Sequence, residues 1–480
     1  MTEGRSSVCG KGAPSGPSSA AVGSAEGDAD ADATGAAEAP GATEAATVGS
    51  ALAPAATGAG GVAETGAGAE DAGVETASPR QPTSSSRNGQ LDLRTPRSRI
   101  TGPSILDAGA QRPSVESGQV TSSAAFERFL RAGHLPGLDG LRCLAILPVI
   151  WHHATPRPLA GVWGKGAVGV DLFFALSGFL ITTLLLRERR ARGSVRLGAF
   201  YARRSLRIFP LYYAVLAGYV VLALAMPEGS PQAEHFLRSL PYHASYTANW
   251  LVDYSVPHAI LFAFSWSLCV EEQFYGVWPI LVALVPRRAH LATLMSAAMV
   301  VDYLAEHGAF AGLAPPGSTS LRILTRFATP LGCGSLAALL LDTPAGFGLA
   351  WRALGRRMAA PLLLAAAVAL LCVPATPYLA LSFCLAGLVA AVAIRPDSGL
   401  GWLLEQRPLR WIGTVSYAAY LLHVSALGLV RRALPAWRET APLVFALGLG
   451  LSLAFAFAAH ALIERPFQRL RSRLHQSLQP

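Results

Sequence analysis

The stretch "GLDGLRCLAILPVIWHHA", Gly137 to Ala154, decides the fold. Most of its residues are apolar, as in a helix surrounded by lipid, yet Arg142 lies near its start and His153 near its end. An arginine at the centre of a span costs roughly 2.5–3.5 kcal/mol on membrane-insertion scales. Ionisable residues in such a helix therefore indicate either a functional site or a position at the membrane surface.

The composition of the whole chain is that of a membrane protein. Of its 480 residues 52% are hydrophobic and 14% are charged, whereas soluble domains carry about 25% charged residues. Ten apolar segments long enough to cross a bilayer follow one another. They lie at 138–156, 166–186, 205–226, 258–285, 290–310, 322–341, 359–374, 378–394, 410–430 and 442–463. We therefore expect an all-α bundle of about ten transmembrane helices within residues 131–480.

Residues 1–130 are rich in Ala, Gly, Ser, Thr and Pro, and they contain almost no apolar runs. Such a segment cannot bury enough apolar surface to offset its chain entropy, so we expect a disordered cytoplasmic tail without a signal peptide. Residues 12–79 hold ten acids and no Lys or Arg, whereas residues 80–131 hold eight Arg. This pattern fits an acidic tail on a basic membrane anchor, a plain solvated tail, or a start codon assigned too far upstream.

Positive charge predicts the orientation. The loop after the second span carries eight arginines between Arg187 and Arg207, and arginine-rich loops stay in the cytoplasm. The later even-numbered loops and the C-terminal segment agree, while Arg431, Arg432 and Arg438 after the ninth span do not. We expect both termini to be cytoplasmic. Because the net charge of +9 comes mainly from these loops, it does not indicate a nucleic-acid partner.

In the first span, eleven residues separate Arg142 from His153. Eleven helical steps return to within about 20° of the starting direction, so the two side chains share one face and stand roughly 16 Å apart along the axis. Arg142 would lie at the cytoplasmic end and His153 deeper. Alternatively, Arg142 is a snorkelling anchor and His153 an interfacial residue beside Trp151.

The second and third spans add polar residues near their ends. In "GVDLFFALSGFLIT", Asp171 lies close to the outer end, where it is either a site residue or a helix cap, and Gly178 allows close helix approach farther in. Arg204 and Arg207 share a face at the cytoplasmic mouth. Their guanidinium groups could bind phosphates, or they could be further determinants of topology.

The fourth span, "FSWSLCVEEQFYGVWPIL", holds Glu271 and Glu272 far from both interfaces. Carboxylates at that depth indicate a functional site by default, and the alternative is an ion pair with Arg326. Sorted by expected depth, the ionisable residues form two layers. Arg142, Arg204, Arg207 and Glu464 are expected at the cytoplasmic level, and His153, Asp171, Trp266, Ser267 and Glu272 from the middle outward.

At this point the chain resembles the acyltransferase-3 family, integral membrane O-acyltransferases that modify bacterial surface polysaccharides, peptidoglycan and some macrolides. The matching motifs occur in the family's order over residues 137–467, beginning with the Arg-x10-His pair Arg142 and His153. They are "GLDGLR…HH", "GVDLFFALSGFLIT", "RRSLRIFPLYY", "WSLCVEEQFYGVWP", "WIGTVSYAAYLLH" and "IERPF". The resemblance implies location in the bacterial cytoplasmic membrane.

The resemblance also implies a chemistry. Acyl-coenzyme A, in the first instance acetyl-coenzyme A, would be a co-substrate rather than a permanently bound cofactor, and no metal is expected. Its phosphates would contact Arg142, Arg204 and Arg207, and its thioester would reach His153, a general base worth about 10²–10⁴-fold in rate. Glu272 or Asp171 would fix the histidine tautomer or stabilise the imidazolium. Trp266, Ser267, Tyr417 and His423 would bind substrate, and we favour direct transfer over an acyl-enzyme.

Several functions remain open at this point. The acceptor would be a hydroxyl of a cell-envelope carbohydrate, such as lipopolysaccharide or another exported glycan, or of a small polyketide such as a macrolide. A secondary transporter would use buried Glu and His as a proton relay, although no two-fold hydropathy symmetry is evident. A sensor whose acidic tail binds a partner is the third alternative.

Overall fold

The structure, a computed structural model, describes residues 121–469 except 156–160, 255, 257–258, 311, 314 and 316–317. Within this part the regular structure is helical and contains no strand, which confirms the expected all-α class. Most of the segment expected to be disordered, residues 1–120, lies outside the described residues. Its end is helical, because Ser122–Arg131 form α1, which begins where the Thr121 hydroxyl accepts a hydrogen bond from the amide of Ala124.

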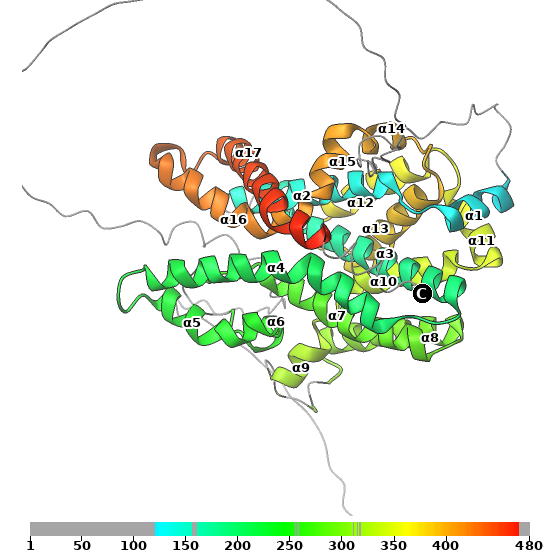
Figure 1. Ribbon diagram of the computed structural model, residues 1–480, viewed down its shortest axis with the longest axis horizontal. Coiled ribbons are helices and arrows are strands. Elements are labelled where there is room, and N and C mark those ends of the chain that lie inside the picture. Colours follow the sequence, from blue (N-terminus) through cyan, green and yellow to red (C-terminus); the bar gives the residue numbers. More distant parts are fainter. Residues whose placement is uncertain are drawn as a thin grey trace, which may run out of the picture. The chain divides into compact units, whose positions relative to one another are not determined.

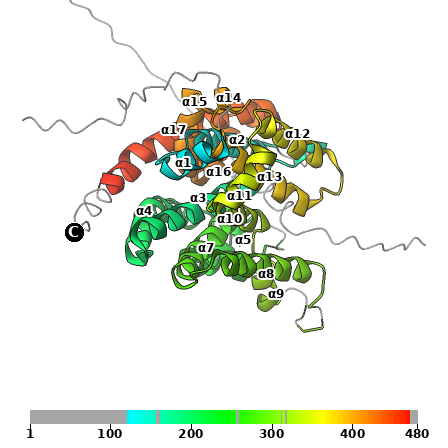
Figure 2. The same cartoon turned by 90° about the vertical axis from the view of Figure 1, so that its right-hand side faces the viewer.

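A central pair of helices organises the described bundle. Both views show α3 (Val168–Arg192) and α10 (Thr329–Leu341) between two groups of helices (Figures 1 and 2). One group contains α4 (Leu197–Leu224), α7 (Ser265–Leu284) and α8 (Arg288–Glu306). The other contains α2 (Pro136–Ala154), α13 (Tyr378–Ile394), α16 (Ser416–Ala433) and α17 (Ala441–Ala459).

Two glycines allow the central pair to pack closely. A Cβ atom on Gly178 of α3 would lie 2.0 Å from the carbonyl oxygen of Leu331, and one on Gly334 of α10 would lie 2.1 Å from that of Ala175. Only glycine lets two helix backbones approach this closely. The close approach that the sequence predicted at Gly178 is therefore confirmed. The α3 helix ends at Arg192 and is followed by Gly193, whose φ of 74° is the left-handed conformation common after helix ends.

Shorter elements complete the described part. They are α5 (Pro231–Ala244), α6 (Ala248–Leu251), α9 (Thr319–Leu324), α11 (Pro344–Leu354), α12 (Ala359–Cys372), α14 (Gly401–Leu404), α15 (Arg407–Thr414), two 3-10 turns (Gly161–Gly164 and Pro435–Trp437) and a π-helical turn (His460–Glu464). The α5 and α6 segments lie beside α4 and α7 in Figure 1 and belong to the long loop that follows the third predicted span.

The structure shows fewer clear membrane spans than the sequence predicted. Four helical stretches in the described part are long and apolar enough to cross a membrane, Val168–Arg192, Leu197–Leu224, Thr319–Leu341 and Ala441–Arg469. The bent pairs α11–α12 and α15–α16, with angles of 71° and 76°, raise the number to six. Helices also occupy the other predicted segments. Among these helices, α2 and α7 carry ionisable residues in their interiors, and neither is a candidate membrane span.

Candidate functional site

Two groups of polar side chains lie in the interior of the bundle. The first, which we call the histidine cluster, connects α2, α7 and α16. The second, which we call the arginine–glutamate cluster, connects α2, α4 and α7. The histidine cluster contains His153, His423, Tyr420 and Ser267, and the arginine–glutamate cluster contains Arg142, Arg204, Glu271 and Glu272.

His153 lies in the last turn of α2, and its Nδ1 atom is 2.9 Å from the carbonyl oxygen of Val149. A carbonyl oxygen only accepts hydrogen bonds, so the neutral His153 ring carries its proton on Nδ1 and keeps a lone pair on Nε2. At the same helix end Nη2 of Arg431 donates to the carbonyl oxygen of His153 at 2.7 Å. This bond satisfies a carbonyl that a helix end leaves without a helical partner. The Nε2 atom thus has the electron pair that a general base needs.

The ring of His423, on α16, faces the ring of His153. The ring centroids are 4.7 Å apart and the ring planes meet at 78°. The Nδ1 atom of His423 lies 2.5 Å from the carbonyl oxygen of Tyr420, which fixes the same tautomer. The side chain is fully buried, and its Nε2 atom has no hydrogen-bond partner in the described part of the chain. Such an atom is uncommon in folded proteins and marks a place where a ligand or water can complete the site.

Ser267 and Tyr420 join α7 to α16. Their hydroxyl oxygens are 2.6 Å apart, and the Tyr420 hydroxyl donates to the carbonyl oxygen of Phe264 at 3.0 Å. The neighbouring Trp266 packs against Phe174 of α3, with ring centroids 6.1 Å apart. The Ser267 hydroxyl is therefore part of a contact between two helices at the edge of the histidine cluster.

Two hydroxyl groups hold the Glu271 carboxylate. Its Oε1 atom accepts a hydrogen bond from Ser177 of α3 at 2.7 Å, and its Oε2 atom accepts one from Tyr275 at 3.3 Å. The guanidinium of Arg204, on α4, lies over the Tyr275 ring, 4.4 Å from its centroid. Arg204 interacts electrostatically with both Glu271 and Glu272. The partly buried carboxylates are thus compensated by a cation, and Glu271 also by hydroxyl donors, as burial of charge requires.

Glu272 interacts electrostatically with Arg204, whereas its expected depth placed it in the same layer as His153. The reason is distance along one helix. Glu272 follows Ser267 by five residues, which corresponds to about 7.5 Å along the axis of α7. Ser267 is at the level of the histidine cluster, and Glu272 lies closer to the arginines.

Arg142 belongs to the same cluster as Arg204. Its Nη1 atom is 3.6 Å from Oδ1 of Asp139, and its guanidinium interacts electrostatically with Glu271 and Arg204. Arg207 is partly buried three residues beyond Arg204 on α4. The arginines expected to bind phosphate are therefore accompanied by carboxylates, which offset part of their positive charge.

Two other predicted site residues make hydrogen bonds to residues that belong to neither cluster. The Asp171 carboxylate accepts a hydrogen bond from the Tyr378 hydroxyl of α13 at 3.0 Å. The Tyr417 hydroxyl donates to the carbonyl oxygen of Ile208 on α4 at 2.9 Å. Asp171 thus links α3 to α13, and Tyr417 links α16 to α4.

Two charged residues noted in the sequence have partners of their own. Arg326, considered as a partner for the carboxylates of the fourth span, interacts electrostatically with Glu306 of α8. Oε2 of Glu464 is 2.6 Å from Nδ1 of His460, one helical turn earlier. Neither residue belongs to either of the two clusters.

Sequence reasoning missed Tyr246. It adopts a φ of 55°, which is strained for a bulky residue, and its ring stacks on Tyr212 with centroids 4.3 Å apart. Its buried hydroxyl has no hydrogen-bond partner within the described residues and interacts electrostatically with Glu272 and Tyr417. Nothing in the "PYHASYTANW" segment indicates the left-handed conformation, so the sequence could not have identified this residue.

The comparison with known families defines the class of this protein. Residues 135–461 match the acyltransferase-3 family model, described as an acyltransferase domain, and the chain belongs to this family. The resemblance seen in the sequence is therefore confirmed. No solved structure matches the chain significantly.

Two curated proteins with similar sequences extend this comparison. The chain is 31% identical over 320 residues to YrhL of Bacillus subtilis strain 168, provisionally named a peptidoglycan O-acetyltransferase, a match that covers 60% of this chain and 48% of YrhL. It is 30% identical over 316 residues to the peptidoglycan O-acetyltransferase OatA of Listeria monocytogenes, covering 60% of this chain and 49% of OatA. The chain thus spans about half the length of these curated relatives.

Proposed function

We propose that the protein is a membrane O-acyltransferase that moves an acyl group, in the first instance acetyl, from acyl-coenzyme A to a hydroxyl of a cell-envelope carbohydrate. The observation that carries this proposal is the histidine cluster, in which the Nε2 atom of His153 is kept as a proton acceptor next to His423. Family membership supports acyl transfer, and the names of two relatives support a glycan acceptor.

In the proposed reaction the acceptor oxygen attacks the thioester carbonyl carbon while its proton passes to Nε2 of His153. The carbon–sulfur bond then breaks, and the imidazolium returns the proton to the leaving thiolate, which departs as coenzyme A. The carbonyl oxygen of Val149 already holds the tautomer. Glu272 and Asp171 would therefore not touch the reacting atoms. They would act as positioning residues: Glu272 would orient Arg204, and Asp171 would hold Tyr378 of α13 in place.

The proposed phosphate-binding residues and the proposed substrate-binding residues form two separate sets. Arg142, Arg204 and Arg207 are proposed to hold the phosphates of coenzyme A, because guanidinium groups bind phosphate oxygens well. The carboxylates of the arginine–glutamate cluster would keep the first two arginines in position before the donor binds. The proposed substrate-binding residues are Trp266, Ser267, Tyr417 and His423.

We further propose that the chain crosses the bacterial cytoplasmic membrane about ten times, with both termini in the cytoplasm. The arginine-rich segment between Arg187 and Arg207 supports this orientation. It would bring the arginine–glutamate cluster toward the cytoplasm, where acyl-coenzyme A is available. Residues 1–130 would then form a cytoplasmic extension.

Release of coenzyme A from acetyl-coenzyme A tests the proposal. Membranes containing the full chain should release coenzyme A faster when crude envelope glycan is added. His153→Ala should lower this rate by about 10²–10⁴-fold, the usual contribution of a general base. The matched control is His152→Ala, which removes the neighbouring ring, 5.3 Å from His153, and should retain most of the activity.

Full activity of a well-expressed His153→Ala protein would overturn the mechanism. Release that depends on a small hydroxyl compound rather than on glycan would favour a metabolite acceptor. No release from folded wild-type protein, with the acyl chain length varied, would contradict acyl transfer and favour a transporter.

A further inference from the structure

A groove of about 540 Å³ lies between α8, α10, α11 and α13, away from both polar clusters. On α10 it is lined by Cys333, Ala337 and Leu340, which recur every three or four residues and so form one face of the helix. From Cys333 to Leu341 this face is about 12 Å long. The groove therefore follows the helix axis.

The hollow results from small side chains. Across the groove, α13 contributes Ala386, Gly387 and Ala390, which lie on one side of that helix, and α8 contributes Ala292. The large Phe383 stands at the edge and is 54% exposed. An apolar hollow left empty forfeits dispersion contacts along its walls, so a hydrocarbon chain fits this surface better than water does.

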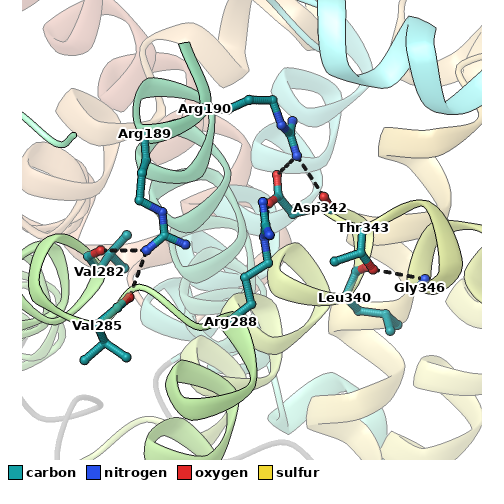
Figure 3. A network of polar contacts seen from close by, with 9 residues as sticks. All are labelled: Arg189, Arg190, Val282, Val285, Arg288, Leu340, Asp342, Thr343 and Gly346. Atoms are coloured by element: carbon teal, nitrogen blue, oxygen red, sulfur yellow. Dashed lines mark hydrogen bonds and ion pairs between the residues drawn. The ribbon is translucent and has the colours of Figure 1, made fainter. Parts of the chain in front are cut away.

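One end of the groove is charged. Arg288 and Thr343 line it at the start of α8 and just after the end of α10. Figure 3 shows Arg190 and Arg288 directed to the same carboxylate, that of Asp342. The Arg190 Nη2 atom donates to Oδ1 of Asp342 at 2.6 Å, and the Arg288 Nε atom donates to Oδ2.

Positive charge exceeds negative charge at this end. Arg189 lies beside the pair, donates to the carbonyl oxygens of Val282 and Val285 at 2.9 Å each, and interacts electrostatically with Arg288 and Asp342 (Figure 3). Arg187 also interacts electrostatically with Arg190 and Asp342, so four guanidinium groups share one carboxylate. The Arg288 side chain is 40% exposed and its bond to Asp342 uses Nε, so its terminal nitrogens can meet an anion at the rim.

We propose that the groove binds one anionic glycerophospholipid of the cytoplasmic leaflet, with an acyl chain between α10 and α13 and its phosphate at Arg288. Basic pockets between transmembrane helices at the cytoplasmic side bind anionic headgroups. The arginine-rich end of this groove is the end predicted to be cytoplasmic. The proposal does not depend on the acyl-transfer chemistry, because the groove shares no residue with the two polar clusters.

Native mass spectrometry of the purified full chain tests the proposal. The protein would be equilibrated in detergent with equal amounts of phosphatidylglycerol and phosphatidylcholine of identical chain length. We expect one retained phosphatidylglycerol per chain, with a roughly fivefold preference over phosphatidylcholine, which corresponds to about 1 kcal/mol. Equal retention of both lipids would overturn the proposed selectivity for an anionic headgroup at Arg288.

Two pairs of variants locate the bound lipid. Ala337→Phe places a large side chain in the groove and should abolish retention, whereas Ala369→Phe, at an exposed position of α12, should not. Arg288→Gln should remove the preference for phosphatidylglycerol, whereas Arg287→Gln, at the exposed neighbouring position, should leave it nearly unchanged.

The Ala337→Phe and Ala369→Phe variants keep the proposal testable if Arg288→Gln does not fold. Retention of phosphatidylglycerol by a folded Ala337→Phe protein would overturn the proposed position of the lipid. A dimer that excludes lipid would also overturn it, because a second copy of the chain would then cover the groove.

Discussion

At the residue scale, the ring of His153 has a neighbour that helical period alone could not predict. Its face on α2 could be predicted from the sequence, because Arg142 and His153 are eleven residues apart. Its contact with His423, 270 positions later in the chain, depends on how α2 and α16 pack. The same holds for Glu272, whose neighbour Arg204 lies on another helix.

The proposed phosphate contact at Arg207 can be separated from the chemical step. We expect Arg207→Gln to raise the KM for acetyl-coenzyme A about tenfold or more with little change in kcat, because a hydrogen bond to a charged group contributes about 1.5–3 kcal/mol. Steady-state kinetics at two salt concentrations would measure the effect. The control is Arg203→Gln, whose arginine pairs with Glu188 at 3.2 Å and should leave KM nearly unchanged. Equal KM values for Arg207→Gln and wild type would contradict the proposed contact.

His243, on α5, gives the protein a dependence on pH. Burial lowers the pKa of its imidazole to about 4, with a further contribution from His235, while Nδ1 lies 2.9 Å from the Ser265 hydroxyl. The unfolded chain takes up this proton near pH 6.5 and the folded chain only near pH 4. Acidification between these values therefore favours unfolding, by up to about 1.4 kcal/mol per pH unit.

Thermal unfolding in detergent between pH 7 and pH 5 would measure this dependence. His243→Asn should reduce the slope of Tm against pH, and His290→Asn, at an exposed position of α8, should leave it unchanged. A slope in His243→Asn equal to that of the wild type would show that His243 is not a source of the acid sensitivity.

At the element scale, the contact between α3 and α10 depends on Gly178. We expect Gly178→Ala to destabilise the protein by about 1–3 kcal/mol, because the added methyl group meets the carbonyl oxygen of Leu331 and the two backbones must separate. Gly218→Ala on α4 is the control, since nothing lies within 4 Å of its Cβ, and alanine favours a helix over glycine by up to about 1 kcal/mol. Thermal unfolding of both variants would compare them. Equal Tm values would show that the helices can move apart without cost.

At the scale of the whole molecule, the topology can be tested with Cys372. It lies at the end of α12, is exposed, and belongs to a turn predicted to face outward, whereas Cys143, Cys269, Cys333 and Cys384 are buried. A maleimide that does not cross membranes should therefore label the protein in intact cells, and Cys372→Ser should abolish the labelling. A Cys9→Ser background excludes the remaining cysteine. Labelling of Cys372 only after the cells are opened would reverse the predicted orientation.

The sequence by itself determined the all-α class, the shared face of Arg142 and His153, and membership of the acyltransferase-3 family. These features depend on apolar runs, helical period and local motifs, all of which lie within one segment at a time. Only the tertiary structure decided that His423 meets His153, that Glu272 lies beside Arg204, and that Asp171 turns to Tyr378. The physical reason is that helical period tells which residues share a face, whereas contacts between helices depend on packing of side chains far apart in the chain.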